Sequence, residues 1–185
     1  MTRLWTGTGD DGTTGLLYGG RATKSSPQLE AVGAADEAQA AVGVARAEVA
    51  GGSELDVILT GVCRDLWVLM AELATAPEHR ARLVEGQTVV TTDMVATVER
   101  VIVDVSSRFE LPSEFVIPGQ DRTSALLDLA RTVVRRAERA AQPVLSEGSH
   151  ALPYLNRLSS LLWVLARWAE DDPLPTRLPR TPDDR

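Results

Sequence analysis

Residues 121–145 read DRTSALLDLARTVVRRAERAAQPVL. At about 100° per residue, a helix would gather Arg131, Arg135, Glu138 and Arg139 within an arc of about 100°. The opposite side of this helix would be apolar and carry Leu126, Ala130, Val133, Ala137, Ala140 and Val144. The stretch therefore predicts an amphipathic helix with a core face and a guanidinium face, and we call the second face the arginine stripe.

The arginine stripe requires an explanation, because four arginines in nine residues concentrate positive charge on one face. Their partner can be a carboxylate of the same fold, a neighbouring subunit or a phosphate ligand. A simple solvated face is the commonest reason for such a run of charges. The rest of the chain must decide between these alternatives.

The composition places limits on the class of protein. A chain of 185 residues with 44% hydrophobic and 24% charged residues is typical of one soluble globular domain. Its net charge of −7 argues against a general binder of nucleic acid or of membrane surfaces. No apolar run reaches the roughly 18 residues that span a bilayer, and residues 1–20 lack the core of a signal peptide. With Cys63 as its single cysteine, expected to be a buried and inert thiol, the chain is predicted to be cytoplasmic.

The first 25 residues are predicted to form a structured loop around TGTGDDGTTG, residues 6–15. Its four glycines allow close backbone approach, and its N–H groups and threonine hydroxyls can cradle phosphate, although a plain surface turn remains open. The motif is neither a Walker A loop nor an EF-hand. Lys24, the only lysine among 19 basic residues, is either retained by chance or kept as a compact charge for phosphate.

The remaining pattern predicts an all-α fold. Helices are expected at about 27–50, 54–75, 92–109 and 153–170, besides the one in residues 121–145. Without convincing strand alternation, this indicates a five-helix bundle over residues 26–170, with a loop at 76–90 and a flexible tail at 171–185. Trp67 and Trp163 are expected to be packing residues.

Five motifs follow one another along nearly the whole chain. They are Thr6–Thr14 with Gly9-Asp10-x-Gly12, Val32-Gly33-Ala-Ala-Asp36-Glu37, Phe115-x-x-Pro118-Gly119, Arg131-x-x-x-Arg135-Arg136-Ala-Glu138-Arg139, and Asn156-Arg157-Leu158-Ser159. In these motifs and in their order the chain resembles the PduO-type ATP:cob(I)alamin adenosyltransferases. The resemblance implies a helical bundle assembled as a homotrimer, with active sites between subunits. It also implies transfer of the 5′-deoxyadenosyl group of ATP to cob(I)alamin, with Mg²⁺ on the ATP phosphates and no metal site built from side chains alone.

The resemblance assigns roles to particular residues. Residues matching the ATP site are Thr6, Gly7, Thr8, Gly9, Thr14, Gly15, Lys24, Arg135, Arg136, Glu138, Arg139 and Asn156. Lys24 and Arg135 would act on the triphosphate. Asp36 and Arg131 match an ion pair across the subunit interface near the corrinoid. Phe115 matches an aromatic that displaces the lower axial ligand of cob(II)alamin, although the pattern alone equally allows a loop anchor packed on the core. Trp5 and Gly7 depart from the family, which commonly has tyrosine and a basic residue there, so ATP affinity is open.

Two other functions are compatible with parts of the pattern. A non-catalytic nucleotide-binding regulator would keep the loop and the arginines but lose Phe115 or Asp36, and both are present. A ferritin-like metal bundle needs a pair of Glu-x-x-His motifs, and the two histidines, His79 and His150, do not supply such a pair. The enzyme is therefore favoured, with a reductase and an adenosylcobalamin-dependent enzyme as possible further partners, and with neither nucleic acid nor membrane.

Overall fold

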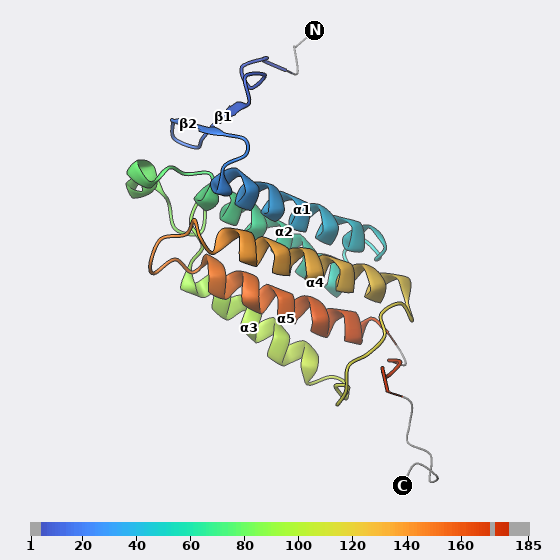
Figure 1. Ribbon diagram of the computed structural model, residues 1–185. Coiled ribbons are helices and arrows are strands. Elements are labelled where there is room, and N and C mark those ends of the chain that lie inside the picture. The colour runs from blue at the N-terminus through green and yellow to red at the C-terminus, as the bar shows by residue number, and fades with distance from the viewer. Residues whose placement is uncertain (1–4, 171–172, 178–185) are drawn as a thin grey trace, which may run out of the picture.

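The computed structural model describes residues 5–170 and 173–177. Within them the chain forms five α-helices: α1 (Pro27–Ala47), α2 (Glu54–Leu73), α3 (Thr92–Ser106), α4 (Arg122–Ala141) and α5 (Ala151–Trp168). The helices run alongside one another in one bundle (Figure 1). Each lies where the sequence predicts a helix, so the predicted helical bundle is confirmed.

Short polar side chains begin four of these helices. Ser26 accepts a hydrogen bond from the backbone N–H of Leu29 at 3.3 Å, and Pro27 follows it as the first helical residue. Ser53, Thr91 and Asp121 cap α2, α3 and α4 in the same way. Each cap satisfies a backbone N–H that the helix itself leaves unpaired. The helix starts therefore depend on local sequence.

Small residues bring α1 and α4 close together. The buried face of α1 consists mainly of alanines, and it packs against both α2 and α4. The buried apolar residues of α4 are Leu127, Ala130, Val134, Ala137 and Ala141. The observed core face of α4 is therefore shifted by about one residue from the predicted one. Four of its predicted members, Leu126, Val133, Ala140 and Val144, are only partly buried beside the core.

Helix α5 lies within the bundle and packs against both α4 and α3. Its largest buried side chains include Leu155, Leu158, Leu162 and Leu165. A helix covered on several sides is apolar around most of its circumference. Polar residues that α5 does expose are therefore informative about function.

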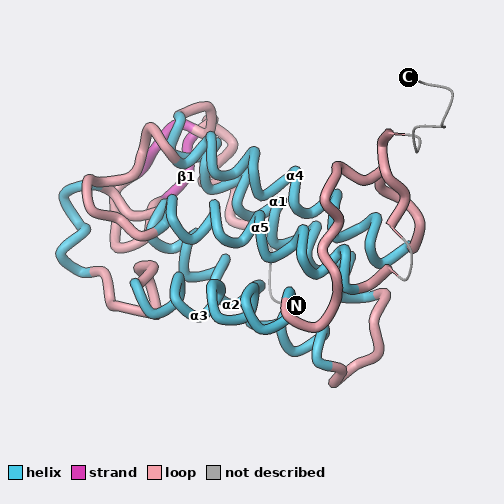
Figure 2. The backbone as a smooth tube through the Cα atoms, turned by 90° about the horizontal axis from the view of Figure 1, so that it is seen from below, coloured by secondary structure: helices cyan, strands magenta, loops and turns pink. Residues whose placement is uncertain are grey.

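A small β-hairpin precedes the bundle, although the sequence predicts no strands. β1 (Thr13–Gly15) pairs antiparallel with β2 (Arg21–Thr23), with Thr14 opposite Ala22. Three residues per strand are too few to give a recognisable alternation. The hairpin lies at the end of the bundle where α1 begins (Figures 1 and 2). The predicted loop at 76–90 likewise contains a short 3-10 helix, η1 (Pro77–Arg82).

Contacts distant in sequence fix the hairpin to the bundle. The backbone N–H of Leu17 donates to the carbonyl of Ala74, just after α2, at 2.9 Å. Arg82 of η1 donates from Nη1 to the Tyr18 carbonyl at 2.9 Å, and its guanidinium lies 4.6 Å from the centre of the Tyr18 ring. The loop that precedes α1 is thus held by η1 and by the end of α2. No helix in the described part of the chain is long and apolar enough to cross a bilayer.

Candidate active site

The arginine stripe lies on the outer face of α4, as predicted. Arg135, Arg136 and Arg139 are exposed, and Arg131 is 28% exposed. Arg136 forms an ion pair with Glu37 of α1, and Arg139 Nη1 donates to the carbonyl of Arg135 at 2.9 Å. Arg136 is therefore paired with a carboxylate of the neighbouring helix α1, while the charged groups of Arg135 and Arg139 are exposed to solvent.

A hollow of about 250 Å³ lies between α4 and α5 beside the stripe. Arg131 and Arg135 line it from α4, while α5 contributes Ser159, Ser160, Trp163 and Val164. Two guanidiniums, two hydroxyls and an indole suit an anionic ligand with an aromatic or apolar part. Trp163, expected to be a packing residue, is partly buried against the core and also forms part of this wall. Ser160 was also missed, although it follows Asn156 by one helical turn and so shares its face.

Asn156 is held at the start of α5 by charged neighbours. Its Nδ2 donates to Glu138 Oε1 at 3.2 Å, and its Oδ1 accepts a hydrogen bond from Arg157 Nη1 at 2.7 Å. Arg157 in turn pairs with Glu99 of α3 at 2.8 Å. The structure thus brings two predicted site residues, Glu138 and Asn156, into contact, and the pairing fixes which way the amide points.

Two basic side chains hold the N-terminal loop through hydrogen bonds to its backbone carbonyls. Lys24 Nζ donates to the carbonyl of Gly9 at 2.7 Å, and Arg21 Nη2 donates to that of Thr8 at 2.6 Å. A side chain at position 9 would have its Cβ only 3.1 Å from the Thr13 carbonyl and 3.3 Å from Lys24 Nζ. Glycine at this position therefore lets the lysine lie across the loop.

Other loop residues remain accessible. Thr6, Gly7 and Thr8 are exposed, and the hydroxyls of Thr6 and Thr8 are 2.7 Å apart. Thr14 and Gly15 belong to β1. Hydrogen bonds from the hydroxyl and the backbone N–H of Thr13 hold the pKa of Asp11 below its ordinary value, so the loop keeps a charged carboxylate.

The predicted ATP site draws on two parts of the chain. Lys24 and the glycines and threonines of the loop precede α1, whereas Arg135 and Arg139 lie on α4. Lys24 donates to the Gly9 carbonyl and Arg139 to the Arg135 carbonyl, so each part has hydrogen bonds of its own.

Phe115 is 87% exposed, which excludes packing against the core of its own chain. Its segment is nevertheless tied down, because the Phe115 carbonyl accepts from the Thr176 N–H and the Ile117 N–H donates to the Leu174 carbonyl, both at 2.8 Å. Residues 173–177 of the predicted flexible tail thus pair with this segment. Residues 171–172 and 178–185 lie outside the described residues, so the flexible tail stays a prediction.

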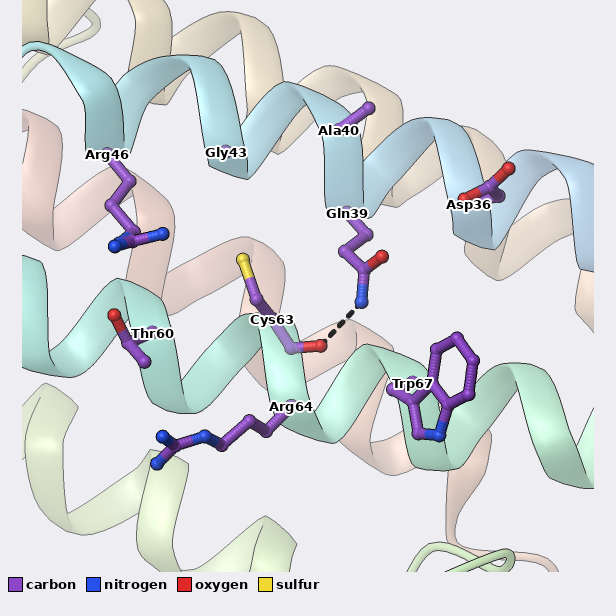
Figure 3. A pocket seen from close by; sticks show the side chains of 9 residues that line it. All are labelled: Asp36, Gln39, Ala40, Gly43, Arg46, Thr60, Cys63, Arg64 and Trp67. Atoms are coloured by element: carbon purple, nitrogen blue, oxygen red, sulfur yellow. Dashed lines mark hydrogen bonds between the residues drawn. The ribbon is translucent and has the colours of Figure 1, made fainter. Parts of the chain in front are cut away.

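Asp36 lies on a different surface, at a hollow of about 500 Å³ between α1 and α2. Figure 3 shows Asp36 and Trp67 at one end of this hollow and Arg46 and Arg64 toward the other. Trp67 was expected to be a packing residue, but 67% of it is exposed. Within this chain the prediction for Trp67 is therefore wrong, because the helical pattern of α2 does not show which of its sides the other helices cover.

Cys63 forms part of the same hollow. Gln39 Nε2 donates to the Cys63 carbonyl at 2.6 Å, which joins α1 to α2 along its floor (Figure 3). The thiol is half-buried rather than fully buried, and burial raises its pKa. A raised pKa disfavours the thiolate form, and the inert thiol stays a prediction.

Asp36 and Arg131 do not pair within the chain. Arg131 Nε instead donates to Asp128 Oδ1 of its own helix at 3.0 Å. Asp36 lines the α1–α2 hollow and Arg131 lines the α4–α5 hollow. The pair is predicted between two subunits, and the structure contains a single chain. The Asp36–Arg131 pair therefore stays a prediction.

Residues 4–169 match the family model for cobalamin adenosyltransferase. The chain belongs to the cobalamin adenosyltransferase family. This match covers the loop, the stripe and both hollows. The resemblance seen in the five motifs is therefore confirmed at the level of the family.

Individual relatives agree with this family. The chain is 38% identical to a corrinoid adenosyltransferase of Mycobacterium tuberculosis, over 93% of this chain and 91% of the relative. It is 32% identical to corrinoid adenosyltransferase PduO of Salmonella typhimurium, over 91% of this chain and 50% of the relative. A solved structure of a variant PduO-type ATP:corrinoid adenosyltransferase from Lactobacillus reuteri, complexed with cobalamin and ATP, matches with a TM-score of 0.79. Its sequence identity is 25%, and the match covers 90% of each chain.

Proposed function

We propose that this cobalamin adenosyltransferase family member transfers the 5′-deoxyadenosyl group of ATP to the cobalt of cob(I)alamin. The products are adenosylcobalamin and triphosphate. The observation that carries the proposal is the family match over residues 4–169, together with relatives named corrinoid adenosyltransferases that align along nearly their whole length. The arginine stripe and the loop supply cationic and hydrogen-bonding groups that a triphosphate requires.

The reaction places few demands on acid–base groups of the protein. Co(I) supplies the electron pair of the new cobalt–carbon bond, and the bond from C5′ to its oxygen breaks with that pair leaving on triphosphate. No serine, cysteine or general base has to be activated. The protein must align cobalt with C5′ and stabilise the charge that develops on the leaving group.

The triphosphate side of the site would come from the stripe and the loop. Arg135, Arg139 and Lys24 would contact the phosphates, while the glycines and threonines at 6–9 and 14–15 would enclose the nucleotide. Arg136 and Glu138 would support them through Glu37 and Asn156, with which they already interact. We place the complete site between two subunits, as the resemblance to the family implies.

Magnesium would accompany the nucleotide. In the described residues, no group of three or more His, Cys, Asp or Glu side chains could hold a metal ion. This donor set fits an ion held mainly by substrate phosphates and water, which is how proteins usually bind Mg²⁺. When bound there, Mg²⁺ neutralises part of the charge on the leaving triphosphate.

The corrinoid side would be formed where Phe115, Arg131 and Asp36 of two subunits approach. A homotrimer fits the two unlike hollows, because a ring with threefold symmetry joins two different surfaces of each chain. The exposed Trp67 beside Asp36 is typical of a residue that another subunit covers. We further propose a cytoplasmic enzyme that receives Co(I) from a reductase and delivers adenosylcobalamin to a client enzyme.

The proposed function has a direct test. The purified protein is mixed without oxygen with ATP, Mg²⁺ and chemically reduced cobalamin, and the absorption spectrum is followed. We expect conversion to adenosylcobalamin together with release of one triphosphate per turnover. ATP binding without any adenosylcobalamin would instead identify the non-catalytic regulator.

The trimer and its ion pair give a second prediction. We expect sedimentation to show a trimer at micromolar concentration, and Asp36→Asn to weaken corrinoid binding, because Arg131 of the neighbouring subunit would lose its partner. The loss should be on the order of tenfold, as for a partly buried charge pair.

Glu30→Gln is the matched control for this prediction. It removes one exposed carboxylate from the same helix at a position outside both hollows. Corrinoid affinity should not change in this variant. A stable monomer would disprove the assembly, and unchanged cobalamin affinity in Asp36→Asn would disprove the pairing.

A further inference from the structure

A buried charged network lies behind the α4–α5 hollow. Arg167 of α5 has a side chain that is 1% exposed, and its Nη2 donates to Asp128 Oδ2 of α4 at 2.7 Å. Its Nε pairs with Glu170, which also accepts a hydrogen bond from Ser124 Oγ at 2.7 Å. The other oxygen of Asp128 accepts the hydrogen bond from Arg131 Nε at 3.0 Å. Negative and positive side chains thus alternate along the network in the order Glu170, Arg167, Asp128 and Arg131.

This network is neutral, and only one of its four charged members reaches the surface. Glu170 and Arg167 have side chains that are 1% exposed, Asp128 has 6%, and Arg131 has 28%. Buried ion pairs add little to stability compared with apolar packing of the same volume. Stability alone therefore gives no reason to join α4 to α5 with charges. Its exposed end, the guanidinium of Arg131, is also a wall of the hollow.

The geometry of the Arg131 contact leaves its outer nitrogens available. Asp128 engages Nε, and in the part of the chain that the structure describes neither Nη1 nor Nη2 of Arg131 has a hydrogen-bond partner. An arginine fixed through Nε keeps one side-chain conformation and presents its two terminal nitrogens as a fork. The same network orders the neighbouring wall, because the Arg167 guanidinium lies 5.9 Å from the centre of the Trp163 ring.

We propose that Asp128 is a positioning residue for the corrinoid side of the reaction. Held by buried Arg167, it fixes Arg131 so that the Nη fork faces the hollow and the neighbouring subunit. It does not touch substrate, and it acts only through Arg131. The proposal rests on the proposed function, because it names what Arg131 is oriented for.

Two matched variants separate positioning from structural support. Asp128→Asn and Glu170→Gln each remove one of the two carboxylates of Arg167, but only Asp128 contacts Arg131. Both should lower the melting temperature. We expect Asp128→Asn alone to weaken cob(II)alamin binding, by about tenfold, the factor for one charge-assisted contact. ATP affinity should be unchanged in both variants, because Asp128 contacts neither the loop nor Arg135.

A double-mutant cycle tests whether the effect passes through Arg131. In an Arg131→Ala background, Asp128→Asn should cause no further loss of corrinoid affinity. A full tenfold loss in that background, or an equal loss in Glu170→Gln, would overturn the proposal. If Asp128→Asn does not fold, Asp128→Glu replaces it, because it keeps the charge but moves the carboxylate by one methylene, and the same outcomes apply.

A measurement on the ligand-free protein keeps this proposal separate from the proposed function. The NMR signal of the Arg131 Nε–H, assigned by its loss in Arg131→Ala, should exchange slowly with water and become fast in Asp128→Asn but not in Glu170→Gln. Fast exchange in the unmodified protein would overturn the positioning. Failure to form adenosylcobalamin, with the slow signal present, would refute the proposed function and leave the Asp128–Arg131 contact standing.

Discussion

Arg135→Ala and Lys24→Ala are each expected to lose most of the turnover while the protein stays folded. Both side chains are exposed, so neither supports the core. Each would lose one charge-assisted contact to the leaving triphosphate, which costs on the order of 1.5–3 kcal/mol. If that contact strengthens in the transition state, the rate falls by roughly one to two decades. Steady-state kinetics with ATP and reduced cobalamin measure the loss.

Arg100→Ala is the control for this pair of variants. Arg100 is an exposed arginine of α3, outside the stripe and the loop, and its Nη2 donates only to Thr97 of the same helix. Its removal changes net charge and helix composition as Arg135→Ala does, so activity should be retained. Rates within twofold of the unmodified enzyme for both Arg135→Ala and Lys24→Ala would show that the triphosphate binds elsewhere.

The parts of this fold that depend on local sequence could be predicted. Ser26 followed by Pro27 fixes the start of α1, and the helical period places the arginines on one face of α4. The core face of α4 was placed one residue off because both Leu126 and Leu127 are apolar. Which of the two is fully buried depends on how α4 packs against α1 and α5, and both of these helices contact α4 across long separations in the sequence.

Contacts between distant segments could not be predicted. The hairpin strands are too short to show alternation, and they are held by Leu17 bonding to Ala74 and by Arg82 bonding to Tyr18. Asp128 shows the same limit. A carboxylate three residues before Arg131 indicates a local pair, but no pattern in the sequence announces the buried Arg167, 39 residues further on.

The candidate site was also predictable only in part. The residue types indicate which side chains can bind phosphate, and the resemblance implies their roles. The sequence did not reveal that Trp67 and Phe115 are exposed, because apolar side chains that face another molecule follow the same helical and loop patterns as those that face the core. The exposure of both residues is consistent with the proposed corrinoid site between subunits.

Phe115→Ala is expected to affect cobalt coordination and to leave ATP affinity close to that of the unmodified enzyme. The aromatic ring is 87% exposed on a segment directly before α4, so it is free to contact a corrinoid bound beside that helix. Its role would be to exclude water and the dimethylbenzimidazole base from the lower side of cobalt. Removal of an axial ligand makes Co(II) easier to reduce, because the reduced ion has little affinity for it.

The starting oxidation state separates this role from simple packing. With cobalamin supplied as Co(II) and a reductant, turnover of Phe115→Ala should fall by more than tenfold, the scale of a contact realised only in the reactive state. With cobalamin supplied as Co(I), the fall should be much smaller, because four-coordinate cobalt is already present. A loss that is equal from both starting states would mean that Phe115 only aids binding.

Ile117→Ala tests whether any truncation of this segment has the same effect. Ile117 lies two residues further on, is 45% exposed, and keeps its backbone bond to Leu174 whatever its side chain. The deciding observation is the spectrum of Co(II) bound with ATP. The four-coordinate signature should persist in Ile117→Ala and disappear in Phe115→Ala, because only the second variant opens the lower side of cobalt to a ligand. An undiminished signature in Phe115→Ala would rule out any action of this ring on cobalt.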